Sequence, residues 1–481
     1  MEKNEDKGIS VKKSEDFNEW YNQVVLKADL IEYSLVSGCI VFKPNSYSIW
    51  EKIQRIFDDK IKSSGHKNCY FPMFIPESLL KKESQHVQGF SPEVAWVTKA
   101  GNTELNERLA IRPTSETIMY ESYSKWIRSW RDLPLLLNQW NSVVRWEFKH
   151  AKPFLRTREF LWQEGHTAHA TKEDAEREVM QQLFEYADLI ENYLAIPVIA
   201  GKKTDNEKFA GADYTTTVES LMPDGKALQM GTSHMLGQNF SKVFDIKFLD
   251  TDEQSKYVFQ TSWGLSTRTI GALIMVHGDD KGIIVPPKVA PTQIVIVPIL
   301  FKDTKEEVIA KSKELAKKMR LKHSVELDLR DGYTPGWKFN EWEMKGVPLR
   351  IELGPKDIGQ EQVVAVRRDT NEKIVIKFKD IEKKIEQILE GIQNDLFKKA
   401  KDFLVKSTID VNSLENLKKA ISDKKMAKAQ FCGSTDCELK IKEFAEGATC
   451  RCIPFEQKPA EGNCVQCNSK AKSWALFAKN Y

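Results

Sequence analysis

Charged and aromatic side chains alternate along the stretch from Val143 to His166. Two β-like runs, Asn141 to Phe148 and Leu155 to Glu164, flank a loop, and this pattern predicts a hairpin. Alternate residues of a strand share a face. One face of the hairpin would therefore carry Arg145 and Glu147 opposite Arg156, Arg158, Phe160, Trp162, Glu164 and His166.

This mixture of residue types favours a nucleotide ligand. Guanidinium groups pair with phosphates, and an aromatic plane stacks on a base. The loop of the hairpin adds Lys149, Lys152 and Pro153. The alternative is a salt-bridged sheet face exposed to solvent, which would bind nothing.

Further polar strings could line the same pocket. Thr114 and Glu116 are two residues apart and would face one cavity if the chain is extended there. The runs Phe209 to Thr217 and Gln229 to Phe240 are too polar for core strands, so we expect them at a pocket wall. A lone histidine such as His234 is more often a structural hydrogen-bonding group than a catalyst.

A third string, Gly264-Leu-Ser-Thr-Arg268-Thr-Ile-Gly271, leads into the apolar run ALIMVH. This pattern predicts a strand that feeds a helix, with Arg268 at the junction. The positive end of the helix dipole lies there too, so the junction favours an anion.

Several longer elements must position these residues. Apolar residues recur at helical spacing from Tyr47 to Gly65, and an extended run follows from Asn68 to Ile75. Pro72 within that run argues for a sheet edge or an interface. Thr171 and Asp174 begin a helix that reaches about Leu194 and serves as scaffold.

A proline-rich boundary, Val285 to Pro291, separates a second domain. Beyond it strands alternate with helices, which predicts a mixed sheet covered by helices. Asp303 with Glu306 would cap the first helix, and the last helix would run from Ile381 to about Leu404. The string from Gly336 to Glu343 mixes aromatic and charged residues, as single-stranded base recognition requires. The alternative is a solvated loop with a packed tryptophan.

Cysteine is concentrated near the end of the chain. The spacing Cys432-x4-Cys437, then 26 residues, then Cys464-x2-Cys467 predicts a tetrahedral zinc site. Cys450 and Cys452 are rival ligands. The segment has few aliphatic residues to bury, which favours a structural metal. A preceding basic run is either a solvated helix face or an RNA patch; it comprises Lys418, Lys419, Lys424, Lys425 and Lys428.

Composition sets outer bounds. A chain of 481 residues requires more than one core. No apolar run is long enough to span a membrane, and Met1 to about Glu15 is a polar tail without a signal peptide, so we expect a cytoplasmic protein. A net charge of +3 neither demands nor excludes nucleic acid. The apolar end, Trp474 to Tyr481, should be tied down on the protein.

The motif spacing resembles a known family. Arg145-x-Glu147, a loop, and then Arg156-x3-Phe160-x3-Glu164 resemble the second signature motif of the class II aminoacyl-tRNA synthetases. With the strings from Arg112 to Thr117 and from Lys208 to Tyr214, nearly the whole chain resembles the prolyl-tRNA synthetases of the archaeal and eukaryotic-cytosolic type. The third motif lacks an acidic residue just before Arg268, so that match leans on the prolyl subgroup.

The resemblance implies an α+β and α/β multidomain protein. Residues 1–16 would be a polar tail, 17–286 a class II catalytic domain built on an antiparallel sheet, 287–404 an α/β anticodon-binding domain, and 405–481 a small zinc-binding domain. It implies a homodimer joined through the helix and strand between Tyr47 and Ile75. It also implies ligation of L-proline to tRNA(Pro) through prolyl-adenylate, with ATP, Mg²⁺ and a structural Zn²⁺, without the large editing insertion of the bacterial type.

The resemblance also implies roles for individual residues. The phosphate-binding, catalytic residues would be Arg145, Arg156 and Arg268. The proline site would contain Thr114, Glu116, Arg145, Trp162, Glu164, His166, His234 and Ser266. The ATP site would contain Arg145, Glu147, Arg156, Thr157, Phe160, Gln229, Thr232 and Arg268. The anticodon site would contain Phe339, Glu341, Glu343, Arg350 and Lys356, and the metal site Cys432, Cys437, Cys464 and Cys467.

Two alternative functions compete with this interpretation. One is a synthetase-like binding protein that has lost activation, which predicts missing phosphate arginines. The other is a class II ligase for another small amino acid.

Overall fold

The computed structural model describes residues 8–84, 93–147 and 151–481. Its main feature is an eleven-stranded sheet in the order β20-β21-β23-β22-β9-β10-β11-β14-β8-β7-β3. The central strands are antiparallel, as predicted for a class II core. They are β7 (Leu135–Val144), β8 (Glu159–His169), β9 (Ile199–Lys202), β10 (Tyr214–Leu221), β11 (Lys226–Gly237) and β14 (Phe259–Ser266).

The predicted hairpin is formed by β7 and β8, in which Asn141 pairs with Trp162 and Val143 with Phe160. The strands end earlier at the loop than the alternation indicated. Arg156 and Arg158 lie before β8 starts, in a turn closed by a bond from the Arg156 amide to the Lys152 carbonyl. The prediction that these arginines share the strand face was therefore wrong, and Lys149 lies outside the described residues.

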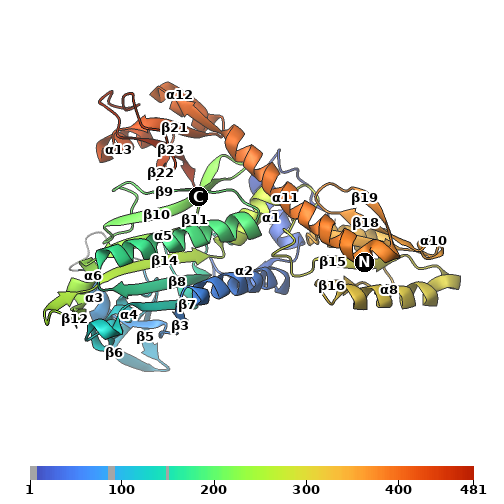
Figure 1. The fold of residues 1–481 in the computed structure, drawn as a ribbon, viewed down its shortest axis with the longest axis horizontal. Coiled ribbons are helices and arrows are strands. Elements are labelled where there is room, and N and C mark those ends of the chain that lie inside the picture. The colour runs from blue at the N-terminus through green and yellow to red at the C-terminus, as the bar shows by residue number, and fades with distance from the viewer. Residues whose placement is uncertain (1–7, 85–92, 148–150) are drawn as a thin grey trace.

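One helix, α5 (Lys172–Asp188), crosses the sheet over β8, β14, β11 and β10 (Figure 1). Thr171 accepts a hydrogen bond from the Asp174 amide at its start, as predicted. The buried side of α5 includes Val179, Leu183 and Tyr186. A π-helical turn from Leu189 to Tyr193 continues the helix to the predicted end.

The predicted long helix is α2 (Pro44–Ser63), and Gly65 follows it with a φ of +91°. The run from Asn68 to Ile75 is split. β3 (Lys67–Asn68) lies at the edge of the large sheet, β4 (Phe74–Pro76) pairs with β6, and Pro72 lies in neither. The edge position was predicted correctly, but the single continuous strand was not.

The start of the described chain is held on the protein, whereas its composition indicated a disordered segment. The Ser10 amide donates to Gln23 Oε1 over 2.8 Å, the Lys13 amide donates to Asp280 Oδ1 over 2.8 Å, and Ile9 packs against the main core. The prediction of a polar tail is therefore wrong for residues 8–16, and residues 1–7 lie outside the described residues.

The remaining elements of the first half are short. They are α1 (Phe17–Lys27), β1 (Ile31–Tyr33), β2 (Ile40–Phe42), α3 (Glu77–Ser84), β5 (Trp96–Ala100), β6 (Thr103–Ile111), α4 (Glu116–Trp126), α6 (Asn239–Phe244), β12 (Lys247–Leu249), β13 (Ser255–Tyr257) and α7 (Arg268–His277). The predicted strand-to-helix junction at Arg268 is thus confirmed, since β14 ends at Ser266 and α7 begins at Arg268.

A second sheet, in the order β16-β15-β17-β18-β19, has the mixed topology that was predicted. Its first three strands are parallel and its last two pairings antiparallel. The elements are β15 (Ile294–Pro298), α8 (Lys305–Met319), β16 (Val325–Leu327), α9 (Pro335–Met344), β17 (Leu349–Leu353), α10 (Pro355–Gly359), β18 (Gln362–Arg367), β19 (Lys373–Lys377) and α11 (Ile381–Ser407).

One local prediction in this domain fails, and one alternative is excluded. Asp303 does not cap α8, because it lies in a 3-10 turn and Thr304 occupies the N-cap position. The string from Gly336 to Glu343 is not a loop. It forms helix α9, which is capped by Thr334 and begins with Pro335 at its first position.

The C-terminal segment contains β20 (Thr408–Val411), α12 (Leu414–Ser422), β21 (Met426–Phe431), α13 (Thr435–Phe444), β22 (Thr449–Pro454) and β23 (Ser473–Asn480). It has an apolar core of its own that includes Leu417, Phe431, Ile441 and Phe477, so the premise that it has little to bury was wrong. The apolar chain end is strand β23, which confirms that it is tied down.

The C-terminal strands extend the large sheet. β22 pairs with β9, and β23 pairs with the start of β11. Figure 1 shows α11 running from the small α/β domain to this segment. Among the described residues, no helix is long and apolar enough to cross a membrane.

Candidate active site

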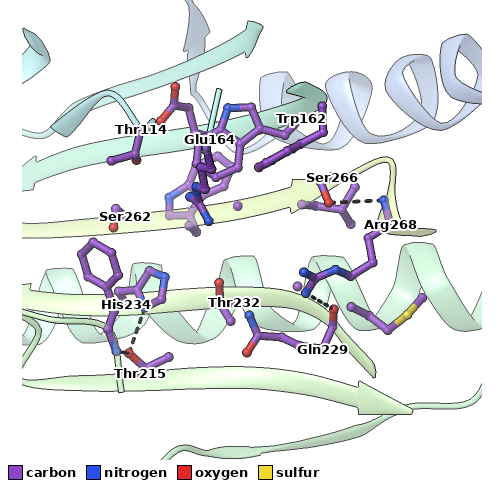
Figure 2. A pocket seen from close by; sticks show the side chains of 18 of the residues that line it. Thr114, Trp162, Glu164, Thr215, Gln229, Thr232, His234, Ser262, Ser266 and Arg268 are labelled. Atoms are coloured by element: carbon purple, nitrogen blue, oxygen red, sulfur yellow. Dashed lines mark hydrogen bonds between the residues drawn. The ribbon is translucent and has the colours of Figure 1, made fainter. Parts of the chain in front are cut away.

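A cavity of about 320 Å³ lies over the central strands. Its lining comes mainly from β8, β11, β14 and the segment 154–157 before β8, with Arg268 from the start of α7. Figure 2 shows its two ends, with Gln229 and Arg268 at one and Thr215 and His234 at the other.

Strand pairing brings the lining residues together. Thr232 lies opposite Gly264, which lies opposite Glu164. A second row joins His234, Ser262 and His166 in the same way. Residues that pair across antiparallel strands share a face, so both rows point into the cavity. The polar runs in β10 and β11 are therefore buried central strands that line a pocket, contrary to the expectation that they could not be core strands.

The two faces of the sheet need different residue sizes. Trp263 alternates with the cavity residues and packs on the other face, where it lies opposite Gly165. A Cβ on Gly165 would lie 2.1 Å from the Trp263 ring. Glycine at this position therefore allows the tryptophan to fill the layer beneath the cavity.

One end of the cavity gathers carboxylates. Glu116, Glu164 and His166 are buried, and their ligand atoms lie within 4.8 Å of one another. Thr114 Oγ1 donates a hydrogen bond to Glu116. Thr114 and Glu116 share the cavity as predicted, but Glu116 is the first residue of helix α4 and the chain is not extended there.

Glu164 is held from several sides. His166 Nε2 lies 3.1 Å from its Oε2, Asn141 Nδ2 donates to its Oε1 over 2.7 Å, and the Ser115 hydroxyl also donates to it. Burial alone raises the pKa of Glu164, but the bonds from His166, Ser115 and Asn141 outweigh it and lower the pKa to about 2.

The pKa of His166 is shifted in the opposite direction to that of Glu164. Burial lowers the pKa of His166, while the nearby carboxylates of Glu116 and Glu164 raise it and prevail. The lowered pKa of Glu164 keeps a negative charge at this end of the cavity, which suits an ammonium group.

Arginines line the rest of the cavity. Arg145 Nε donates to the Pro113 carbonyl over 3.1 Å, and its guanidinium carbon lies 5.4 Å from the Trp162 ring centre. Arg268 Nη1 donates to the Gln229 carbonyl over 3.3 Å. Arg156 and Thr157 also line the cavity. All three predicted phosphate arginines are therefore brought to one cavity.

These cations repel one another. Burial, followed by the charges of Arg145 and Arg156, lowers the pKa of Arg268 to about 10. Burial also lowers the pKa of Arg145. Three guanidinium groups in a half-buried site favour a polyanion, because its charge relieves their repulsion.

Two residues of the predicted face lie elsewhere. Arg158 turns toward the β1–β2 hairpin, where its Nη1 donates to the Ser37 carbonyl over 2.9 Å and its guanidinium stacks on Trp146. Glu147 is exposed in the turn after β7 and does not line the cavity. Glu147 acts on Arg145 only through its charge.

Phe160, Trp162 and Ser266 line the cavity as predicted, with the Phe160 and Trp162 rings edge-to-face at 5.9 Å. His234 lines it too, and its Nδ1 lies 2.9 Å from Thr215 Oγ1. Burial and the nearby His166 lower the pKa of His234 to about 3, so the ring is neutral. The expected hydrogen bond of His234 is therefore present.

Several lining residues lie in the runs that were expected at a pocket wall, but the sequence analysis gave them no individual role. Phe209 stacks against His234 with ring centres 4.7 Å apart, and Thr215 and Met230 line the same wall. The signal for Phe209 was present, because it lies in the string from Lys208 to Tyr214. The supports Ser115 and Gln139 could not be found, since only the fold brings them to Glu164.

The proposed anticodon residues lie on the second domain. Arg350 is buried, donates to Glu343 and Glu352, and stacks over Phe339 at 4.1 Å. Glu341 pairs with Arg330 and Lys345. Lys356 is exposed on α10. The cluster is therefore pre-paired, and Phe339 and Trp342 pack partly into the domain, on Val295 and Val297.

Four cysteine sulfurs converge in the C-terminal segment. Cys432, Cys437, Cys464 and Cys467 offer ligand atoms that all lie within 4.8 Å of one another. Cys450 and Cys452 are buried in β22 and do not belong to this group. The set of four thiols suits Zn²⁺. The basic run beforehand includes Lys418, Lys419 and Lys424, which are exposed.

Known families match most of the chain. Residues 96–277 match the family described as tRNA synthetase class II core domain (G, H, P, S and T), residues 293–388 match the anticodon binding domain, and residues 414–481 match prolyl-tRNA synthetase, C-terminal.

Whole-chain relatives agree with these matches. A proline–tRNA ligase of Natranaerobius thermophilus is 55% identical over 97% of this chain and 97% of its own length. Proline–tRNA ligase 2 of Bacillus cereus is 55% identical over 98% of each chain. A proline–tRNA ligase of Alkaliphilus oremlandii is 54% identical over 97% of this chain and 96% of its own.

Proposed function

The chain belongs to the prolyl-tRNA synthetase family, and from this premise we propose how its residues perform the reaction. The activity is that of a proline–tRNA ligase. L-Proline and ATP form prolyl-adenylate and diphosphate, and the prolyl group then passes to tRNA(Pro) with release of AMP.

A single observation carries the assignment of roles. One cavity brings the carboxylates of Glu116 and Glu164 together with three arginines, and the charges of both carboxylates act on Arg145. A zwitterionic amino acid next to a triphosphate presents its charges in the complementary order. Neither a binding protein that lost the arginines nor a purely structural sheet face would need this arrangement.

The proline site uses Glu116 as acceptor for the ammonium and Thr114 as a second acceptor. Glu164 and His166 hold this acidic end in place, Trp162 and Phe209 supply apolar walls, and His234 and Ser266 close the site. A secondary ammonium has two N–H donors, so one carboxylate with a neighbouring oxygen satisfies both.

The ATP site uses Phe160 against the adenine, with Gln229, Thr232 and Thr157 along the nucleotide. Arg145 lies between the two sites and holds the α-phosphate beside the reacting carboxylate, while Arg156 and Arg268 hold the outer phosphates. Glu147 contributes through its charge on Arg145. The carboxylate of proline is the nucleophile, so catalysis consists of in-line positioning and charge neutralisation.

Mg²⁺ supplies further neutralisation of the phosphate charge when it is bound. The lining residues assigned to the phosphates are the arginines Arg145, Arg156 and Arg268. This donor set fits a metal held by phosphate oxygens and water, as Mg²⁺ prefers. Zn²⁺ would be held by the cysteine group of the C-terminal segment, where it stabilises the fold.

The remaining assignments follow from the same premise. The chain divides into 17–286, 287–404 and 405–481, with the anticodon bases read by Phe339, Glu341, Glu343, Arg350 and Lys356. Two copies associate through α2 and the edge strand β3, where Tyr70 is 69% exposed. The role in translation implies a cytoplasmic location.

Aminoacylation tests this function. Purified protein with ATP, radioactive proline and tRNA(Pro) should form prolyl-tRNA and AMP, and the same tRNA with altered anticodon bases is the matched control. Equal charging of both tRNAs would refute the anticodon assignment. No charging of either would refute the ligase assignment.

A further inference from the structure

Three charged side chains form a buried network beside the cavity. Lys203, Glu219 and Arg451 are each 4% exposed or less. Lys203 Nζ donates to Glu219 Oε1 over 2.7 Å. Arg451 donates to Glu219 Oε2 from Nη2 over 3.0 Å and from Nε over 3.2 Å. One carboxylate thus serves two cations.

The network joins two parts of the chain that are far apart in sequence. Glu219 lies in β10 and Lys203 directly follows β9, whereas Arg451 lies in β22 of the C-terminal segment. Lys203 Nζ also donates to the Arg451 carbonyl over 2.8 Å. A Cβ on Gly201 would lie 2.5 Å from the Ile453 carbonyl oxygen, so the two backbones are in close contact here.

The same network borders the phosphate end of the cavity. Glu219 pairs across the sheet with Gln229, and Gln229 accepts the hydrogen bond from Arg268 through its carbonyl oxygen. The charges of Glu219 and Arg451 both act on Arg268. Glu219 is therefore a carboxylate that could take Arg268 away from a phosphate.

We propose that Arg451 is a positioning residue for adenylation: it holds the Glu219 carboxylate in the network, so that Arg268 stays available to the phosphates of ATP. The inference rests on the proposed role of Arg268. It gives the C-terminal segment a part in ATP binding that is separate from its metal.

Arg451 can affect Arg268 because Lys203 and Arg451 share the carboxylate of Glu219. With Lys203 and Arg451 in place, the oxygens of Glu219 accept bonds from both cations and from Thr217, which donates over 3.0 Å. Without Arg451, Oε2 loses its partners, and a buried carboxylate oxygen without a partner is costly. The nearby Arg268 guanidinium is then drawn to Glu219.

The experiment is ATP–pyrophosphate exchange with ATP and proline varied in turn. Arg451→Met should raise the KM for ATP about tenfold, the effect of losing one charge-assisted contact, and leave the KM for proline within about twofold. Adding Glu219→Gln to Arg451→Met removes the competing carboxylate and should restore the KM for ATP. If Arg451→Met acted only by disturbing the fold, adding Glu219→Gln would impair exchange further and would not restore the KM for ATP.

Lys428→Met is the matched control, because Lys428 lies in the same segment and pairs with Asp410 there. It should leave both KM values unchanged. Zinc content and melting temperature are measured for every variant. If Arg451→Met does not fold, Arg451→Gln removes the charge while keeping a donor and repeats the test.

The inference is overturned if a folded Arg451 variant has the normal KM for ATP, or if Glu219→Gln fails to restore it. Arg268→Met separates this outcome from a failure of the proposed function. If Arg268→Met raises the KM for ATP and Arg451→Met does not, only the inference fails. If Arg268→Met leaves that KM unchanged, the role of Arg268 itself is wrong.

Discussion

The hydroxyl of Tyr481, the last residue, donates a hydrogen bond to Oδ2 of Asp224 over 2.6 Å. The ring lies between two ammonium groups, with Lys152 Nζ 4.8 Å and Lys226 Nζ 4.9 Å from its centre. Lys152 belongs to the loop that leads into β8 and the nucleotide site. The end of the chain thus braces the loop that carries Arg156.

Deleting Asn480 and Tyr481 should therefore slow proline activation without unfolding the protein. The deletion removes the contact between the Tyr481 ring and Lys152 but leaves most of β23 in place. Exchange kinetics and circular dichroism measure the two effects. Tyr481→Phe is the matched control, because it removes only the hydroxyl and should have a smaller effect. Normal exchange in the truncated form would contradict this role.

The cysteine group gives a prediction about metal content. Purified protein should hold about one Zn²⁺ per chain, and Cys464→Ser should release it and lower the stability of the C-terminal segment. Elemental analysis and limited proteolysis provide the measurements. Cys450→Ser alters a buried cysteine outside the group and should keep the metal. Metal retained after loss of both Cys464 and Cys467 would refute the assignment.

Glu116→Gln keeps the shape of the proline pocket and removes its charge. A charge-assisted bond contributes about 1.5–3 kcal/mol, so the KM for proline should rise about 10- to 100-fold. The KM for ATP should stay nearly constant, because Glu116 lies at the opposite end from Arg268. Exchange kinetics with proline and ATP each varied in turn give both KM values. A changed KM for ATP with a normal KM for proline would show that the pocket is misassigned.

The local positions that depend on short spacing could be predicted from the sequence. The strand-to-helix junction at Arg268 and the period-two alternation of Trp162, Glu164 and His166 appear as predicted. Local rules failed where tertiary contacts decide the conformation. Arg158 leaves the strand face because its backbone amide donates to the Gly38 carbonyl of a distant hairpin, a contact that no short window of sequence contains.

Long-range pairing accounts for the other misses. The strands β10 and β11 seemed too polar for a core because their side chains face a cavity and one another. The C-terminal segment seemed to need zinc for want of a core, yet its strands join the catalytic sheet through β9. Arg451 carries no local motif, and only that pairing places it beside Glu219.

A buried histidine makes stability depend on pH. Burial outweighs a hydrogen bond to the Leu194 carbonyl and lowers the pKa of His277 to about 4. In the unfolded chain the pKa is about 6.5, so the unfolded state binds more protons between these values. The contribution of His277 to stability is therefore full above about pH 6.5 and is lost as the pH falls toward 4.

His277→Gln keeps a donor for the Leu194 carbonyl and removes the titration. The unaltered protein should lose about 2 kcal/mol more than this variant between pH 7.5 and 5. Melting temperatures at both pH values measure the difference. His234, whose pKa is lowered to about 3, titrates in the same direction and remains in both proteins. Parallel pH profiles would contradict the account.

The central claim is that the cavity selects proline and joins it to ATP. The most direct measurement is ATP–pyrophosphate exchange by the unaltered protein across a panel of amino acids. Proline should support the fastest exchange, with weaker exchange for alanine, because alanine fits the pocket and lacks only part of the ring. Faster exchange with any other amino acid, or none with proline, would contradict the account.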